Sequence, residues 1–195
     1  MLDFIDLVGV VELIGSELQT EVEEVLLQLT ELCRRFRIDV LTAIHAAQSG
    51  HPGGSFSCID ALTELYFDEM NIDPANPAWE DRDRFVLSKG HCSPALYSVL
   101  ALRGYFPTED IKLFRSIKAH YSGHPDMRHV PGVDMSTGSL GQGLSVAVGM
   151  ALSARLAGKS WRTYAICGDG EIEEGQVWEA AMFAAHNKLD NLVAI

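Results

Sequence analysis

The sequence predicts an α/β fold in which helices cover the faces of a parallel β-sheet. The first observation is a long helical pattern near the N-terminus, where apolar residues recur at helical spacing to about Gln48. The second is an alternation of short apolar runs with helical segments between Phe85 and Ile195. Strands that alternate with helices form parallel sheets with covered faces. A chain of 195 residues with 47% hydrophobic content also supports one sizeable packed domain.

Composition excludes several classes of protein. The formal net charge of −12 argues against a nucleic-acid-binding protein, because phosphate contacts require clustered Lys and Arg. The four cysteines are widely spaced without a CxxC pair, which indicates reduced thiols and a cytoplasmic location. No stretch reaches the roughly 18 uncharged apolar residues that a membrane span requires. We therefore expect a cytoplasmic protein that binds neither nucleic acid nor membrane.

Residues 1–18 are expected to form an N-terminal extension, and residues 19–195 the domain itself. The extension is apolar but carries Asp3, Asp6 and Glu12. It lacks the basic start and the small-residue cleavage site of a secretory signal. We interpret it as an appended amphipathic helix or as vector-derived sequence.

The first half of the domain is predicted to be mainly helical. The long helix should run over 22–48, with Gly50 as its stop signal and a loop over 51–55. Ser57 and Asp60 then resemble a capping box that opens a second helix through residue 70. Residues 71–83 contain two prolines and should be irregular.

Strands and helices then alternate. Phe85–Leu87 is a short apolar run typical of a strand, and Ser93 before a proline is a good N-cap for a helix that ends near Gly104. A long irregular segment over 118–138 follows, and loops of that length usually have a function. The remaining predicted elements are a buried helix over 140–156, a strand over 163–167, a helix over 176–186 and a strand over 192–195.

One acidic residue stands where α/β proteins bind their ligands. Asp169 lies between Gly168 and Gly170, directly after a predicted buried strand and so at the carboxyl edge of the sheet. Glycines there permit unusual backbone angles and let a phosphate come close. A carboxylate is a hard ligand suited to Mg²⁺ or Ca²⁺, which commonly bridge a protein to phosphate oxygens. Taken alone, Gly-Asp-Gly is also a good turn, so both interpretations remain open at this point.

Four ordered segments resemble those of transketolases, over roughly Leu29 to Ile195. The Gly-Asp-Gly segment, together with the strand that ends the sequence, is similar to the motif that binds thiamine diphosphate. The other three segments are similar to transketolases in particular. The four segments are Ser49–Gly54, Leu87–His91, Thr137–Gly143, and Gly168–Gly170 with Lys188–Ile195.

This resemblance implies a thiamine-diphosphate-binding fold and assigns cofactor contacts. It implies that Asp169 is the ligand of a divalent metal, Mg²⁺ or Ca²⁺, and that the Gly170 amide lies near the diphosphate. His91 would contact the diphosphate. Three further residues would place their backbone against the aminopyrimidine ring, namely Gly138, Ser139 and Leu140.

The resemblance also implies residues that act on the substrate. His51 and His124 resemble histidines that line the channel for sugar phosphates, where an imidazole exchanges protons and hydrogen bonds with hydroxyls. Glu174 resembles the glutamate that links the two active sites of a homodimer through a shared proton. The alternatives for His51 and His91 are purely structural roles, such as satisfying a carbonyl at a helix end.

Three histidines in the long irregular segment raise a different possibility, a zinc site. His120 and His124 lie four residues apart, and His129 follows. Gly123 and Pro125 prevent the helix that would place the first two on one face, which disfavours zinc.

The resemblance finally implies an incomplete fold at the C-terminus. In the family, the rest of the metal site and the domain that carries an activating glutamate lie beyond the matched region. We therefore expect a C-terminal transketolase subunit or domain as partner, and negligible turnover without it. The expected activity is the transfer of a two-carbon ketol unit between sugar phosphates, as in the pentose phosphate pathway. The alternatives are another thiamine diphosphate enzyme component, such as a deoxyxylulose-phosphate synthase or a 2-oxo acid dehydrogenase component, and a catalytically silent binding or assembly module.

Overall fold

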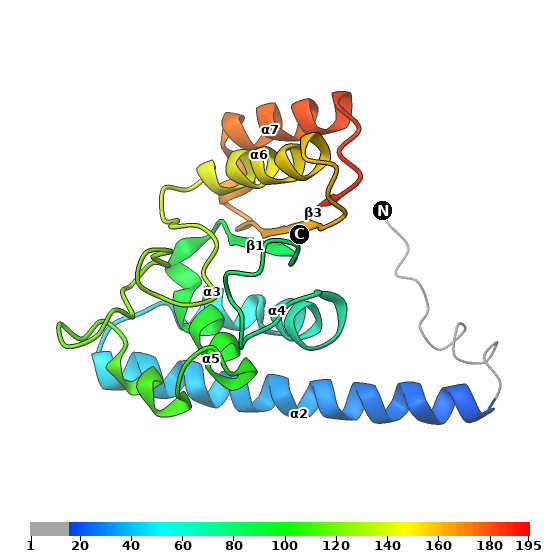
Figure 1. Ribbon diagram of the computed structural model, residues 1–195. Coiled ribbons are helices and arrows are strands. Elements are labelled where there is room, and N and C mark those ends of the chain that lie inside the picture. Colours follow the sequence, from blue (N-terminus) through cyan, green and yellow to red (C-terminus); the bar gives the residue numbers. More distant parts are fainter. Residues whose placement is uncertain (1–15) are drawn as a thin grey trace.

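The computed structural model describes the backbone of residues 16–195 and the side chains of residues 22–195. Figure 1 shows a β-sheet between two groups of helices, with α6 and α7 on one side and α2 to α5 on the other. In chain order the elements are α2 (Ser16–Ala47), α3 (Pro52–Ser57), α4 (Ile59–Glu64), the π-helical η1 (Leu65–Glu69), β1 (Arg84–Leu87), the 3-10 turn η2 (Gly90–Cys92), α5 (Ser93–Arg103), the 3-10 turn η3 (Thr108–Leu113), α6 (Gln142–Leu156), β2 (Thr163–Ile166), the 3-10 turn η4 (Glu171–Glu173), α7 (Gly175–His186) and β3 (Leu192–Ala194).

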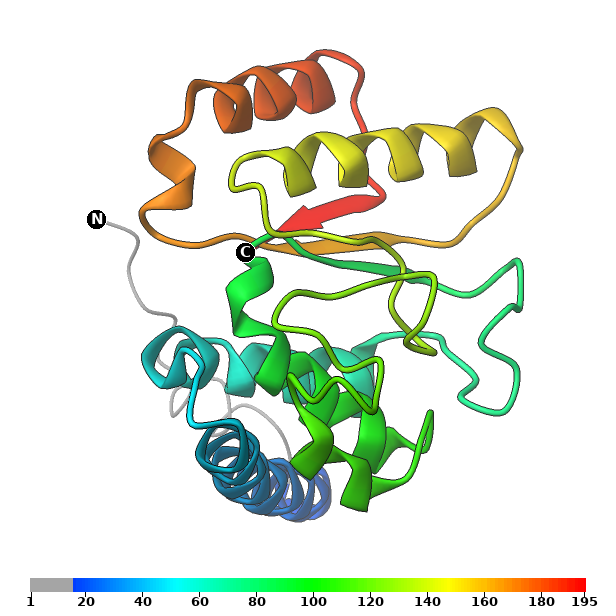
Figure 2. The same cartoon turned by 90° about the vertical axis from the view of Figure 1, so that its left-hand side faces the viewer.

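The sheet is parallel and has the strand order β1-β2-β3 within the described residues. Alternate residues of a strand point to opposite faces, so each face has its own core. Val86 and Ala165 pack in the cluster under α6 and α7, whereas Phe85 and Tyr164 pack with the opposite group of helices. Figure 2 shows both layers of helices, one on each face of the sheet. The predicted parallel sheet with flanking helices is therefore confirmed.

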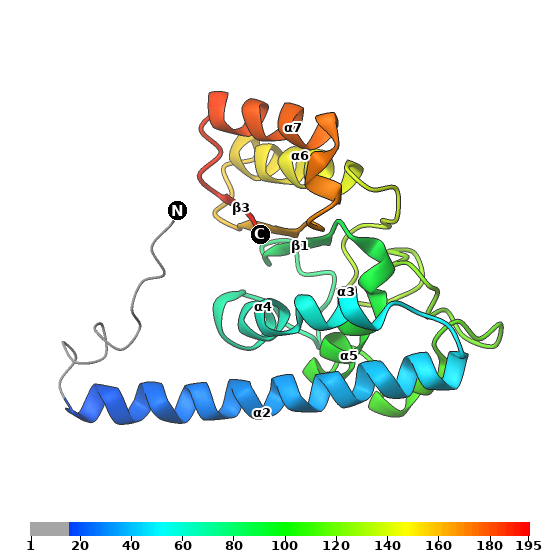
Figure 3. The ribbon, with the colours of Figure 1, turned by 180° about the vertical axis from the view of Figure 1, so that it is seen from behind.

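Helix α2 is the long helix that the apolar spacing predicts. Cys33, Phe36, Val40 and Ala43 recur at helical spacing and are buried. They face α4 and α5, which lie along α2 in the view from behind (Figure 3). The predicted extension lies outside the described residues as far as residue 15, and α2 already begins at Ser16.

Two local predictions were wrong. The predicted loop over 51–55 is largely the short helix α3, because Pro52 occupies the first helical turn, where its missing N–H costs nothing. The proposed capping box does not form. Instead, the Ser57 hydroxyl donates to the carbonyl of Gly54 and accepts from the Lys89 ammonium, so long-range contacts override the local signal.

Ser93 also departs from its predicted role as a helix cap. It is the first residue of α5, and its hydroxyl donates to the carbonyl of Gly123 at 2.9 Å. This bond ties the irregular segment 118–138 to the helix layer. The segment contains turns but no helix or strand, as predicted. No helix in residues 16–195 combines the length and the apolar character needed to cross a bilayer.

Candidate functional site

Three loops meet at the carboxyl edge of the sheet. The first follows β1 and leads into η2, the second precedes α6, and the third follows β2 and contains η4. Apart from the segment 188–195, which contains β3, the motifs singled out in the sequence lie mainly on these loops and at α3. Parallel strands place their carboxyl ends at one edge, which is where open α/β sheets bind ligands.

The buried carboxylate of Glu171 joins the three loops. One of its oxygens accepts hydrogen bonds from the Ser88 hydroxyl and, at 2.8 Å, from the backbone N–H of Gly141. The other oxygen accepts from the backbone N–H of Gly168, also at 2.8 Å. Glu171 is only 2% exposed. Sequence reasoning missed this residue; its one local signal was an acid directly after Gly-Asp-Gly.

Glycines let the first two loops touch. A side chain on Gly90 would place its Cβ 2.7 Å from the Thr137 hydroxyl oxygen and 2.8 Å from the backbone nitrogen of Gly138. Thr137 in turn donates to the carbonyl of Leu87 at 2.6 Å. Gly143, at the start of α6, lies so close to Ser88 that a Cβ added to the glycine would be 2.7 Å from the Ser88 Cα. Only glycine fits at these contacts.

The structure brings His51, His91 and His124 together near this junction. The rings of His51 and His91 meet edge to face with their centroids 5.2 Å apart. The His124 ring lies against Gly138, where an added Cβ would be 2.8 Å from the imidazole Cδ2. These residues come from the N-cap of α3, from η2 and from the irregular segment, so the grouping depends on the fold. Gly138 has a φ of 142°, which favours glycine.

Burial and neighbouring positive charge favour the neutral form of two of these imidazoles. Burial lowers the pKa of His91, and the charges of His51, Lys89 and His124 lower it further, against an opposing effect of Glu171. Burial likewise lowers the pKa of His124, followed by the charges of Arg115 and His51. A neutral imidazole has one donor and one acceptor, so it can both donate to and accept from a ligand.

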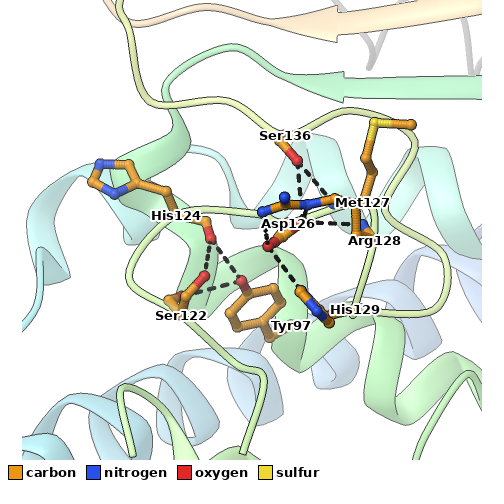
Figure 4. A network of polar contacts seen from close by, with 8 residues as sticks. All are labelled: Tyr97, Ser122, His124, Asp126, Met127, Arg128, His129 and Ser136. Carbon is orange, nitrogen blue, oxygen red and sulfur yellow. Dashed lines mark hydrogen bonds and ion pairs between the residues drawn. The ribbon is translucent and has the colours of Figure 1, made fainter. Parts of the chain in front are cut away.

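A network of polar contacts fixes the backbone of His124 (Figure 4). Its carbonyl accepts hydrogen bonds from the Tyr97 hydroxyl at 3.0 Å and from the Ser122 hydroxyl at 2.5 Å. Asp126 accepts from Arg128, His129 and Ser136, and the hydrogen bonds from Arg128 and His129 lower the pKa of its carboxyl group. The His124 ring points away from this network, so its side chain remains available for a ligand.

The histidines do not gather into the alternative metal site. The rings of His120 and His129 stack with centroids 4.7 Å apart, while His124 points away from His129. In the part of the chain that the structure describes, no three His, Cys, Asp or Glu side chains are grouped as a metal site.

Asp169 has a carboxylate that is free to bind a cation. Its side chain is exposed on the loop after β2, and among the side chains described, those of residues 22–195, and the backbone of residues 16–195 it has no hydrogen-bond or ion-pair partner. A Cβ on Gly170 would have no other atom within 4 Å, so there is open space beside it. Mg²⁺ typically uses one or two carboxylates, with phosphates and water as the other ligands. The chemistry of this site therefore fits such a cation.

The remaining predicted residues flank the junction. Ser139 and Leu140 lie on the loop before α6, and both residues are exposed. A cavity of about 250 Å³ adjoins this loop and is lined by Thr137, Ser139 and Gln142, among others. Glu174 is the N-cap of α7, and its Cβ would lie 3.1 Å from a Cβ on Gly141. Glu174 is thus next to the loop that Glu171 anchors, with an exposed side chain.

Comparison with known proteins gives one family. Residues 29–195 match the family described as transketolase, thiamine diphosphate binding domain. A 6-deoxy-6-sulfo-D-fructose transketolase subunit of Clostridium sp. is 54% identical over 145 residues, which is 74% of this chain and 53% of that protein. An apulose-4-phosphate transketolase subunit of Phocaeicola vulgatus is 47% identical over 152 residues, covering 78% of this chain and 54% of the relative. The chain thus spans about half the length of these curated relatives.

Solved structures agree with the sequence relatives. A transketolase from Leishmania mexicana superposes with a TM-score of 0.81 at 34% identity, over 85% of this chain and 26% of the other. A transketolase variant from Pichia stipitis gives a TM-score of 0.80 at 38% identity, over the same shares of the two chains. Both similarities cover most of the described fold.

Proposed function

The chain belongs to the family of transketolase thiamine diphosphate binding domains, and from this premise we propose that it is the N-terminal component of a transketolase. Its role would be to bind thiamine diphosphate through a divalent cation, Mg²⁺ or Ca²⁺, for two-carbon ketol transfer between sugar phosphates. The observation that carries the proposal is the exposed carboxylate of Asp169, which follows the buried strand β2 and has no partner among the described side chains of residues 22–195.

Each loop would supply one part of the cofactor site. Asp169 would hold the cation, the Gly170 amide would approach the diphosphate, and the neutral His91 imidazole would donate a hydrogen bond to it. The backbone over residues 138–140 would line the aminopyrimidine ring. When bound, thiamine diphosphate supplies the electron sink for cleavage and formation of the ketol carbon–carbon bond. The protein supplies binding and orientation.

His51 and His124 would act on the sugar. The His51 ring meets the His91 ring, and the pKa of His124 is held below its ordinary value by burial and by Arg115. A neutral imidazole can accept a proton from a sugar hydroxyl and return it. The guanidinium of Arg115 also donates to the Ser49 hydroxyl, so a fixed positive charge borders this region and favours an anionic sugar. The two relatives described above are named for sugars that carry a sulfonate and a phosphate, in line with such a substrate.

We further propose that turnover requires a C-terminal transketolase subunit or domain and a homodimeric arrangement. Two relatives at 54% and 47% identity are themselves named as subunits. Asp169 is exposed and stands beside open space at Gly170, so a cation there would need other ligands. Glu174, exposed at the start of α7, would share a proton across the dimer.

Calorimetric titration tests the proposal. Thiamine diphosphate with Mg²⁺ would be titrated into the chain alone and into the chain mixed with a C-terminal transketolase subunit, followed by an assay of ketol transfer. We expect Asp169→Ala to abolish the Mg²⁺-dependent part of binding. Glu173→Gln is the matched control, because it removes a charge from an exposed residue of η4. Absence of binding with every partner and cation would leave the silent assembly module as the function, and robust ketol transfer by the chain alone would refute the need for a partner.

A further inference from the structure

Arg115 contacts both of the chain segments that carry His51 and His124. Its guanidinium donates a hydrogen bond to the hydroxyl of Ser49, two residues before His51. The same guanidinium lies against Gly123, the residue before His124. A Cβ added to that glycine would be 2.6 Å from the Arg115 Nε atom and 2.8 Å from its Nη2 atom. Ser49 and Arg115 are 66 residues apart in the sequence, so the fold creates this bridge.

The backbone of Arg115 is held in an unusual conformation at this place. Its φ is 58°, in the left-handed region that residues other than glycine rarely adopt. Its N–H donates to the carbonyl of Tyr121 at 2.7 Å, and its guanidinium carbon lies 5.3 Å from the centre of the Phe114 ring. Phe114 is buried, so the side chain of Arg115 extends from a fixed point of the core. Such conformations persist only where the surrounding structure holds them, and they concentrate at functional sites.

The two bridged segments are anchored differently. Helix α5 holds the segment of His124, because the Tyr97 hydroxyl donates to the carbonyls of Ser122 at 3.1 Å and of His124 at 3.0 Å. The segment of Ser49 follows the end of α2, where the Ser49 N–H donates to the Ile44 carbonyl at the longer distance of 3.3 Å. The bond from the guanidinium therefore ties this segment to the one that α5 holds.

We propose that Arg115 is a positioning residue that fixes His51 relative to His124, so that both imidazoles can act on one sugar. This role rests on the proposed function, in which these two histidines act on the substrate. A surface cavity of about 440 Å³ lies beside the bridge and is lined by Arg115, Gly123 and His124, among others. Groups that act on one ligand need a fixed geometry, and a misplacement of about 1 Å can cost roughly 100-fold in rate.

The contacts of Arg115 go beyond what attraction of an anionic sugar requires. A charge that only attracts an anion needs no acceptor at Ser49 and no close approach to Gly123. Lys118 carries the same charge on the same irregular segment with an exposed side chain. Arg115 instead donates to a hydroxyl while its planar group packs against a glycine, a geometry that the ammonium of a lysine cannot reproduce.

NMR titration of the folded chain alone tests the bridge without any turnover. Burial lowers the pKa of His124, and the charges of Arg115 and His51 lower it further. We expect the His124 pKa to rise in Arg115→Met, which removes the charge. It should also rise in Ser49→Ala, which keeps the charge but releases the guanidinium from its acceptor. Lys118→Met is the matched control, because it removes the same charge from an exposed residue of the segment, and it should leave this pKa unchanged.

Ketol transfer by the chain with a C-terminal transketolase subunit gives the functional measurement. We expect kcat/KM for a sugar phosphate to fall by about tenfold or more in Arg115→Met, Ser49→Ala and Gly123→Ala. Gly123→Ala keeps every charge, but its methyl group displaces the guanidinium. Arg115→Lys should restore less than half of the lost activity, and Lys118→Met should retain the activity of the wild type. The Kd of thiamine diphosphate should not change, since these residues lie outside the proposed cofactor contacts.

Separate outcomes test the bridge and the proposed function. A positioning role is overturned if Ser49→Ala and Gly123→Ala keep the wild-type kcat/KM while Arg115→Met loses it, because Arg115 would then act through its charge alone. It is also overturned if the His124 pKa is the same in Arg115→Met and in the wild type. If the assembled wild type shows no ketol transfer, the proposed function fails, and the NMR comparison still decides whether the bridge exists. Circular dichroism confirms that each variant is folded, and the folded variants among the three decide the outcome.

Discussion

Replacement of Glu171 by Gln tests whether one buried carboxylate holds the three loops together. Both oxygens of Glu171 accept hydrogen bonds, from Ser88 and Gly141 on one side and from the Gly168 backbone on the other. A glutamine has only one oxygen, so its NH₂ group must face either the Gly168 N–H or the pair formed by Ser88 and Gly141. At least one buried donor then loses its partner.

The expected loss of stability follows from the number of hydrogen bonds that the substitution affects. A buried group without its partner costs about 1–3 kcal/mol, and hydrogen bonds to charged groups are worth about 1.5–3 kcal/mol each. We expect Glu171→Gln to lower the free energy of unfolding by about 2–4 kcal/mol. Urea denaturation followed by circular dichroism measures this, with an unchanged m-value as the sign of two-state behaviour.

Glu173→Gln is the control, because Glu173 lies in the same 3-10 turn with an exposed side chain. It removes the same charge, so a general effect of net charge would appear in both variants. Surface substitutions of this kind usually change stability by within about 0.5 kcal/mol. Equal stabilities of the two variants would refute the reasoning that Glu171 anchors the loops.

Three further predictions concern the same region. Gly143→Ala should destabilise the fold by about 1–3 kcal/mol, because the added methyl group would overpack against Ser88. Gly149→Ala on the same helix is the control, since a Cβ there meets no atom within 4 Å and should not destabilise the fold. Thermal melts compare the two variants. Asp134→Asn should lower the free energy of unfolding by about 3 kcal/mol, because it breaks a largely buried ion pair with Arg82, and Asp134 also accepts a hydrogen bond from the backbone N–H of Phe85 in β1. Urea denaturation measures the loss, and a loss below about 1 kcal/mol would contradict the prediction. The lowered pKa of His91 means that the unfolded chain binds its proton more readily, so stability is retained above the ordinary value of 6.5 and falls as the pH drops below it. NMR titration should give a midpoint below 6.5 for this imidazole, and a midpoint at or above that value would contradict the burial argument.

The sequence was a good guide to elements whose signal is local. The apolar run at Phe85 and the helical spacing of α2 predict the observed strand and helix, because burial of those side chains is the main stabilising force. Ser57 was misinterpreted because its hydroxyl bonds to the Gly54 carbonyl and accepts from Lys89, 32 residues away in the chain. A capping motif depends only on residues that are close in the sequence, so it cannot predict a partner that is distant in the chain.

Residues of the candidate site were found when a motif carried them and missed when a tertiary contact defined them. The resemblance identified His51, His91 and His124, and the fold brings them together. Glu171 was missed because Ser88 and Gly141, two of its partners, lie 83 and 30 residues away.

The position of Glu171 has a consequence for ligand binding. The loops that it joins carry His91, Gly138 and Asp169, which come from three separate parts of the sequence. Ordering a flexible backbone costs roughly 1–2 kcal/mol per residue, so a ligand that had to arrange these loops itself would bind weakly. A carboxylate buried to 2% exposure places them in the folded chain before any ligand arrives. The cation at Asp169 and the diphosphate at His91 would then meet a preformed site, and their binding energy would be available for orientation of the cofactor.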